Sequence, residues 1–177
     1  MKITATLQQP NVETMPPLMG EVYAYWQRIC GDHHMPQWTN FHLDELPPKA
    51  LPWCTVVDIK YDPLDYIYRF YGTLRREMQG AEYTGLSVKT IQPPSFAEKA
   101  CKELDYVLER KASVHIVTSS PQPPASPIVY DILRVPICNK EQVITQILTL
   151  VVGGPNFSRL YEMYGTQAPL YLDNFDG

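Results

Sequence analysis

Two runs of β-branched and aromatic residues, Trp53–Tyr61 and Tyr66–Gly72, are separated by a short segment that begins with Asp62-Pro63. Such runs are typical of strands, and the Asp-Pro pair is typical of a turn. A parallel crossover would need about a dozen residues or more, so the two strands must pair as an antiparallel hairpin. The sequence therefore predicts a fold built on an antiparallel sheet.

Three further strand-like runs follow in the second half of the chain, at Ser113–Ser120, Ile128–Ile137 and Gln142–Val152. The polar residues 139–141 join the last two runs, which predicts a long hairpin. Together with the first hairpin, these runs predict five strands in one sheet.

The segment between the two groups of strands is predicted to be helical, with a short helix at Thr73–Gly80 and a long one at Pro94–Ala112. Apolar residues form one stripe along the long helix, and its charged residues are expected on the opposite side. Helices gathered in the middle of the chain cover one face of a sheet. The predicted fold class is α+β, with a five-stranded antiparallel sheet and helices on one face. The apolar stripe consists of Phe96, Ala100, Leu104, Val107 and Leu108.

An N-terminal helix is predicted at Met19–Cys30, because apolar residues recur there at helical spacing and Gly31 follows its end. In the strand Tyr66–Gly72 both alternating sets of residues are largely apolar, so both faces of the sheet need burial. The N-terminal helix or a second copy of the chain would cover the outer face. We therefore expect a homodimer whose interface is formed by Val22, Tyr25, Trp26 and Ile29.

The length of 177 residues is ordinary for one domain. Residues 1–18 are largely polar without a sustained period, and they are expected to form a flexible N-terminal leader. Residues 19–155 are expected to form the domain and residues 156–177 a C-terminal extension. Within the domain, the proline-containing connector 32–52 carries apolar residues and is predicted to be an ordered wrapping segment.

The charge balance argues against a nucleic-acid surface, since the formal net charge is −4 and Arg75-Arg76 is the only dense basic cluster. No run approaches the roughly 18 apolar residues of a membrane span, and the N-terminus lacks the apolar block of a signal peptide. A cytoplasmic protein without nucleic-acid or membrane partners is therefore expected.

No common catalytic motif occurs in the sequence, whether GxSxG, HExxH, GxGxxG, CxxC or a P-loop. The pair His33-His34 follows Asp32, but adjacent histidines point in different directions in most backbones and no further ligand is close in sequence. We therefore expect neither an enzyme nor a metal site.

Four stretches of the chain occur together in an order that is similar to a known family. In them a helix with a Trp leads through a proline-containing connector into a strand, and an Arg later stands before a Gly-Thr. The stretches are Tyr25-Trp26 with Met35-Pro36 and Leu43–Leu46, Leu51-Pro52 with Val56–Ile59, Tyr68–Thr73, and Gly80 with Tyr83–Gly85. Over residues 21–155 the chain thereby resembles the short, largely stand-alone PAS-domain proteins of bacteria, departing from them at Pro121–Pro127 and after Gly154.

This resemblance implies a PAS fold that binds a small molecule or cofactor between sheet and helices, or that dimerises through its sheet. It implies sensing or assembly without naming a ligand, and we expect no output domain in the chain. Flavin-binding light sensors of this fold carry a reactive Cys in an Asn-Cys-Arg motif, which this sequence lacks. Haem usually takes a His from the long helix or the neighbouring strand; Pro94–Ala112 has none, although His115 begins the next strand. No cofactor is predicted.

Arg69 is the main candidate for ligand binding, because a guanidinium within an aromatic strand must find an anion or carbonyl groups. Its carboxylate partner could come from the protein or from a ligand. The alternatives to a pocket are an ordinary core with hydrogen-bonded tyrosines and a His115 that is merely hydrogen-bonded within its strand. The other candidate ligand-binding residues are Tyr71, Tyr83, Tyr130, Arg134, His115 and Trp38, the last as a lid.

The first functional hypothesis is a PAS-type sensory or signalling module that binds a small molecule or a protein partner. A second is a small lyase or isomerase with a cupped sheet, in which Asp131 is the base and Arg69 clamps an anion. Asp131 could instead pair with Arg134 or Arg69, or face water. A third hypothesis is a dimerisation scaffold that binds no ligand.

Overall fold

The computed structural model describes residues 2–122, 125–154, 156–159 and 171–173. The rest of the predicted C-terminal extension, at 160–170 and 174–177, lies outside the described residues.

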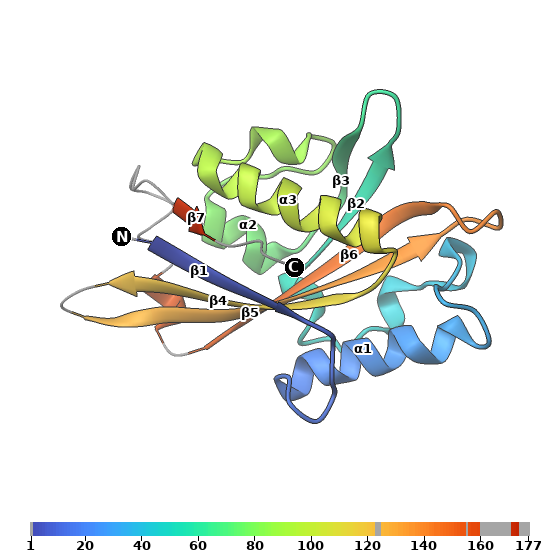
Figure 1. Ribbon diagram of the computed structural model, residues 1–177, viewed down its shortest axis with the longest axis horizontal. Coiled ribbons are helices and arrows are strands. Elements are labelled where there is room, and N and C mark those ends of the chain that lie inside the picture. The colour runs from blue at the N-terminus through green and yellow to red at the C-terminus, as the bar shows by residue number, and fades with distance from the viewer. Residues whose placement is uncertain (1, 123–124, 155, 160–170, 174–177) are drawn as a thin grey trace.

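Seven strands form one sheet within the described residues. They are β1 (Lys2–Gln8), β2 (Cys54–Lys60), β3 (Asp65–Tyr71), β4 (Val114–Gln122), β5 (Ala125–Cys138), β6 (Ile144–Gly153) and β7 (Tyr171–Asp173). Their order in the sheet is β3-β2-β6-β5-β4-β1-β7, and every neighbouring pair is antiparallel except β1 and β7 (Figure 1). The five predicted strands are confirmed as β2 to β6, and two additional strands extend the sheet beyond β4.

Helices cover both faces of this sheet. They are α1 (Pro17–Cys30), α2 (Thr73–Gln79) and α3 (Pro94–Arg110), with short 3-10 helices η1 (Trp38–Asn40), η2 (Leu43–Glu45), η3 (Leu51–Trp53), η4 (Val88–Thr90) and η5 (Phe157–Arg159). The helices α2 and α3 lie on one face, and α1 lies on the other (Figure 1). The predicted α+β class, with helices on one face and an added N-terminal helix, is therefore confirmed. Among the described residues, no helix has the length and apolar character needed to cross a membrane.

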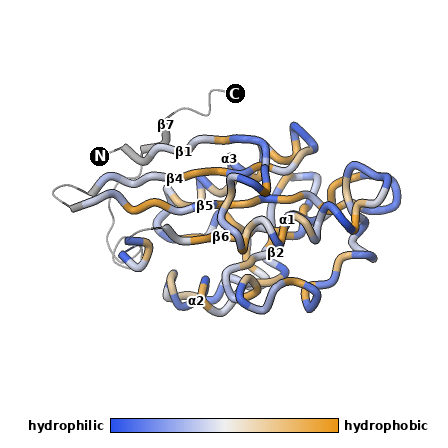
Figure 2. The backbone as a smooth tube through the Cα atoms, turned by 90° about the horizontal axis from the view of Figure 1, so that it is seen from below, coloured by the Kyte–Doolittle hydropathy of each residue, from blue (hydrophilic) through white to orange (hydrophobic). Residues whose placement is uncertain are grey.

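The middle of the sheet forms the centre of the core. Nearly all of β6 is buried from Ile144 to Val151, because it lies inside the sheet and is covered on both faces. Figure 2 shows hydrophobic stretches along β5 and β6. The connector between α1 and β2 also contributes to the core through Phe41, Leu46 and Ala50, so it is ordered as predicted.

The expected flexible leader is wrong for residues 2–8, which form the strand β1. This strand pairs with β4, with Thr6 opposite Val117 in the register. Ala5 and Leu7 are half-buried while Thr4 and Thr6 are exposed, which is the alternation of a strand with one covered face. This alternation covers only a few residues of the sequence, and the partner strand lies more than a hundred residues away.

The predicted dimer interface is corrected by the position of α1. Val22, Tyr25 and Trp26 are buried inside the single chain, and Ile29 is half-buried. Trp26 Nε1 donates a hydrogen bond of 2.8 Å to the carbonyl oxygen of Pro136 in β5. Since the helix covers the outer face of its own sheet, Val22, Tyr25 and Trp26 are occupied within the chain, and Ile29 alone of the four keeps exposed surface.

Trp26→Phe is expected to weaken the fold and leave the oligomeric state unchanged. The substitution removes the indole N–H and leaves the buried carbonyl of Pro136 without its donor, which costs about 1–3 kcal/mol. Urea unfolding would measure the loss, and light scattering would give the mass in solution.

Gln27→Ala is the matched control for this experiment, because Gln27 is exposed on the same helix. We expect its effect to stay within about 0.5 kcal/mol. A lower mass for Trp26→Phe at unchanged stability would instead place the residue in a contact between two copies.

Candidate functional site

A cavity of about 50 Å³ lies between the sheet and the helices α2 and α3. One water needs roughly 10–15 Å³ by this kind of measure, so the cavity has room for roughly three or four water-sized groups. Four of the residues that line it carry charge, namely Arg75, Lys99, Glu103 and Arg134. The other lining residues are Thr55, Tyr68, Gln79, Ile91, Phe96, Ala100, Tyr130, Ile132, Thr149 and Val151.

The strands contribute to the lining from alternate positions, because side chains alternate between the two faces of a strand. Tyr130, Ile132 and Arg134 are every second residue of β5, and all three line the cavity. In the register of the sheet, Arg134 lies opposite Thr149 of β6, and Thr149 lies opposite Thr55 of β2. A polar row therefore crosses three strands beneath the helices.

The helix α3 contributes two charged residues that were predicted to point away from the sheet. Lys99 and Glu103 are buried, with 3% and 0% exposure, so this prediction was wrong for both. They follow Phe96 by three and seven residues, a spacing that places all three on one side of a helix. This spacing is the signal in the sequence that could have found them.

Lys99 and Arg134 share the single carboxylate of Glu103, and we call these three residues the charge cluster. Lys99 Nζ donates to Glu103 Oε1. Arg134 donates to Glu103 Oε2 through Nε at 3.1 Å and through Nη2 at 2.7 Å. Its Nη1 donates to Thr149 Oγ1 at 2.6 Å. Two cations and one anion give the charge cluster a net positive formal charge.

Burial and pairing shift the pKa values of the charge cluster. Burial lowers the pKa of Lys99, and the neighbouring Glu103 opposes that change only in part. Burial alone would raise the pKa of Glu103, but Lys99 and Arg134 together hold it below its ordinary value. Burial also raises the pKa of Tyr130, whose ring centre lies 5.8 Å from Lys99 Nζ. Glu103 is therefore ionised at neutral pH, and the Tyr130 hydroxyl keeps its proton.

The two cations retain hydrogen-bond donors beside the cavity. A guanidinium has five N–H donors, and three of those of Arg134 are used by Glu103 and Thr149 in the described part of the chain. An ammonium has three, and Lys99 gives one to Glu103 among the described residues. The arrangement can therefore donate further hydrogen bonds to an anion.

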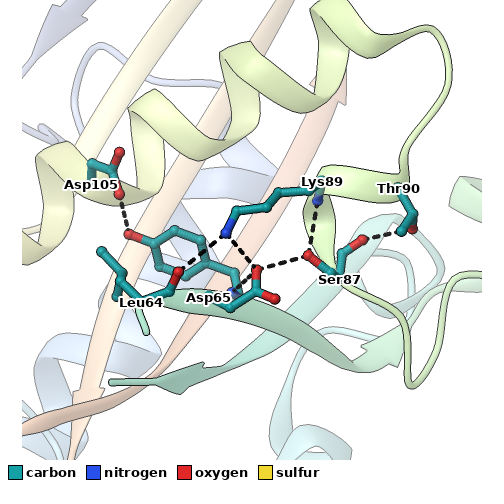
Figure 3. Close-up of polar contacts among 7 residues, drawn as sticks. Leu64, Asp65, Ser87, Lys89, Thr90 and Asp105 are labelled. Atoms are coloured by element: carbon teal, nitrogen blue, oxygen red, sulfur yellow. Dashed lines mark hydrogen bonds and ion pairs between the residues drawn. The ribbon is translucent and has the colours of Figure 1, made fainter. Parts of the chain in front are cut away.

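Polar contacts around Asp65 tie α3 and the segment before it to β3 (Figure 3). Asp65 Oδ1 accepts a hydrogen bond of 2.7 Å from Ser87 Oγ and lies 3.3 Å from Lys89 Nζ. The next residue, Tyr66, is buried and donates its hydroxyl to Asp105 Oδ1 of α3. These contacts fix how α3 lies over the sheet and so fix one wall of the cavity.

Two of the seven predicted ligand-binding residues, Tyr130 and Arg134, line the cavity. Tyr71 and Tyr83 lie next to it, because their rings contact the ring of Tyr68, which is part of the lining. The ring centroids are 4.8 Å apart for Tyr68 and Tyr71, and 6.3 Å apart for Tyr68 and Tyr83. The structure therefore brings four of the predicted residues to this region.

Arg69 and Trp38, which were predicted to share this pocket, lie together away from the cavity. Arg69 Nε donates to Asp58 Oδ1 at 2.7 Å, and its guanidinium carbon is 5.2 Å from the ring centre of Trp38. The internal salt bridge, left open by the sequence, is the arrangement observed. A β-bulge is the physical reason: Phe70 pairs with Val56 and Tyr68 with Val57, so Arg69 is the extra residue that faces the other way.

His115 also lies on the other face of the sheet from the cavity. It pairs in the register with Leu133, whereas the cavity residue Arg134 pairs with Val114. His115 Nε2 is 2.6 Å from Asp131 Oδ1, and His115 Nδ1 is 2.8 Å from the side-chain nitrogen Nε2 of Gln8. Asp131 is therefore bonded to a histidine that the sequence did not indicate as its partner. Asp131 does not line the cavity, so Asp131 cannot act as a base there.

Lys99, Glu103, Arg75 and Gln79 were not predicted as site residues. Arg75 belongs to the pair Arg75-Arg76, which the sequence indicates only as a dense basic cluster. Its neighbour Arg76 is exposed and lies 3.6 Å from Glu82, whereas Arg75 is half-buried and lines the cavity. Among the described residues, no three His, Cys, Asp or Glu side chains gather into a group that could hold a metal ion.

Comparisons with known proteins show similarity in three-dimensional structure only. No protein-family model matches the sequence, and no curated protein is significantly similar to it. A light-oxygen-voltage domain studied with a flavin analogue matches 63% of this chain and 84% of its own, at 14% identity and a TM-score of 0.42. The LOV protein of Rhodobacter sphaeroides matches 62% of this chain and 63% of its own, at 13% identity and a TM-score of 0.43.

A sensory box sensor histidine kinase from Vibrio cholerae matches 81% of this chain and 98% of its own chain, at 14% identity and a TM-score of 0.41. With TM-scores below 0.5, these likenesses carry no argument about this chain. Its own antiparallel sheet and helices give the chain an α+β fold.

Glu103→Gln is expected to lower the free energy of unfolding by about 3–5 kcal/mol. The substitution keeps the size of the side chain but leaves two buried cations without their shared carboxylate. Urea unfolding measures the loss. Glu98→Gln on the exposed side of the same helix is the control, and its effect should be about 0.5 kcal/mol or less. If both variants lose the same small amount of unfolding free energy, the charge cluster does not stabilise the contact between α3 and the sheet.

Acid is expected to destabilise the wild-type protein through Glu103. Its pKa is lower in the folded state than the ordinary value of 4.5, so the unfolded chain takes up the proton first and acid favours unfolding. The stabilisation is present above about pH 4.5 and is lost as the pH falls through the lower, folded-state pKa. Urea unfolding at a series of pH values should show the gap between wild type and Glu103→Gln narrowing in acid. A gap independent of pH would contradict an ionised Glu103.

Proposed function

We propose that this protein is a PAS-type sensory or signalling module that binds a small anion, such as a carboxylate, in the cavity beneath α3. The observation that carries the proposal is that Lys99 and Arg134, both buried at the cavity, share only one carboxylate. On this view the module has no catalytic activity and passes its state to a protein partner by contact.

The charge cluster supports an anionic ligand. A buried charge is costly unless it is paired, and the second cation of the cluster has no carboxylate of its own among the described residues. A carboxylate in the cavity would accept the remaining N–H donors of Lys99 and Arg134 in charge-assisted hydrogen bonds. It would also complete the polar row formed with Thr55 and Thr149.

The volume of the cavity indicates the size of the ligand. Pockets for drug-sized molecules measure about 300–1,000 Å³, whereas this cavity measures about 50 Å³. A ligand of a few non-hydrogen atoms fits without movement of the walls, whereas a flavin or a haem does not. Acetate and formate are therefore suitable first probes.

A homodimer in the cytoplasm of a bacterium remains part of the proposal. Three of the four residues first expected at its interface are occupied within the chain, so another surface would have to form the contact. The oligomeric state is independent of ligand binding in the experiment that follows.

Acetate is expected to raise the unfolding temperature of the wild-type protein, measured against chloride at the same ionic strength. A ligand that binds only the folded state at 100 times its Kd stabilises by about 2.7 kcal/mol. Arg134→Met removes one cation and leaves Lys99 and Glu103 as a neutral pair, so this stabilisation by acetate should be lost.

Arg69→Met is the matched control, because Arg69 is a cation in the same sheet that lies away from the cavity. Its response to acetate should equal that of the wild type. Equal responses in all three proteins would place acetate elsewhere, and no response in the wild type would refute the proposed ligand class.

A further inference from the structure

The amine of Lys99 has three features of a site for covalent attachment. Lys99 is 3% exposed and lines the cavity, so a small molecule inside would meet it directly. Glu103, one helical turn further along α3, contacts the amine and can accept a proton from it. Arg134 reaches the same carboxylate from the sheet and has donors left for a ligand.

Burial makes the Lys99 ammonium easier to deprotonate, and the deprotonated amine is the nucleophile that an imine requires. Burial lowers the pKa of Lys99, and the opposing effect of Glu103 is the smaller one. Lysines in such surroundings form imines with carbonyl compounds. By contrast, Lys102 is exposed on the same helix and lacks a lining position in the cavity.

We propose that the ligand of the cavity is a small oxo acid, bound through its carbonyl group as a reversible imine on Lys99 and through its carboxylate to Arg134. This inference rests on the proposed binding of a small carboxylate. It narrows the ligand class from any small anion to a carboxylate that carries an aldehyde or ketone group.

Formation of the imine on Lys99 is a condensation that needs neither an oxidant nor a reductant. The Lys99 ammonium gives a proton to Glu103, and the lone pair of Nζ forms a bond to the carbonyl carbon while the carbonyl π electrons move to oxygen. A proton passes from nitrogen to that oxygen, which gives a carbinolamine. Glu103 then returns its proton to the hydroxyl group, water leaves, and the nitrogen lone pair forms the C=N bond. The products are a protonated imine, one water and the Glu103 carboxylate.

The charges of the product favour an oxo acid over a simple aldehyde. The protonated imine and Arg134 supply two positive charges, and Glu103 and the ligand carboxylate supply two negative ones. The buried group is then neutral as a whole, whereas an aldehyde without a carboxylate would leave one cation in excess. Arg75, the remaining charged residue of the lining, has an interaction of its own in the structure.

The size of the cavity limits the oxo acid to two or three carbons. Room for roughly three or four water-sized groups suits glyoxylate or pyruvate and excludes long-chain oxo acids. Both compounds are therefore used as probes.

Reduction with cyanoborohydride in the presence of glyoxylate or pyruvate would trap the imine. We expect one adduct per chain on Lys99, with a mass equal to that of the oxo acid less one oxygen atom, located by peptide mapping. Lys99→Arg should lose this adduct, and the control Lys102→Arg should keep it. Acetate should suppress trapping on Lys99 in the wild-type protein, which tests the site even if Lys99→Arg does not fold.

The outcomes separate this inference from the proposed function. Stabilisation by acetate without trapping on Lys99 would overturn the imine and leave the anion site standing. If acetate does not stabilise the protein and no adduct is trapped on Lys99, both the anion site and the imine are overturned. Trapping on Lys99 no faster than on exposed lysines, or trapping that acetate does not suppress, would overturn the imine as well.

Discussion

The structure depends most on the carboxylate of Glu103, which joins α3 to the sheet. Removing two cations and an anion from water costs desolvation free energy, and only close hydrogen-bonded contacts between the charges offset that cost. Here Lys99 comes from the same helix as the carboxylate and Arg134 comes from β5, so the three charges are stable only when helix and strand are in register. The cavity lies beside this contact, since all three charged residues are part of its lining.

A second set of contacts holds the same helix at a different strand. Tyr66 of β3 donates to Asp105, two residues after Glu103, and the preceding Asp65 holds Ser87 and Lys89 of the segment that leads into α3. The helix is thereby fixed to an edge strand and to an inner strand of the sheet. Walls fixed at two places preserve a small cavity that would otherwise collapse, and preorganised walls reduce the free-energy cost of binding a ligand.

Local patterns explain why β2 to β6 and the helices could be predicted from the sequence, and why β1 could not. Each predicted strand carries enough β-branched and aromatic residues to stand out alone, whereas β1 has only short alternation and depends on β4 for its hydrogen bonds. The burial of Lys99 and Glu103 was missed for a related reason. Charged residues on an amphipathic helix normally face water, and the partner that reverses this, Arg134, lies 31 residues beyond Glu103.

The predicted position of Arg69 was wrong because the two-residue alternation of side chains along a strand is interrupted at a β-bulge. Alternation alone places Arg69 and Tyr71 on one face of β3, which is why both were assigned to one pocket. The bulge at Arg69 shifts the period by one residue, so Tyr68 and Tyr71 share the face towards the cavity and Arg69 lies on the other. An arginine in an aromatic strand does need an anion, as the sequence indicated, but its anion is the protein's own Asp58. Arg134 shares its carboxylate with Lys99, and that incomplete balance, not the aromatic setting, marks the site.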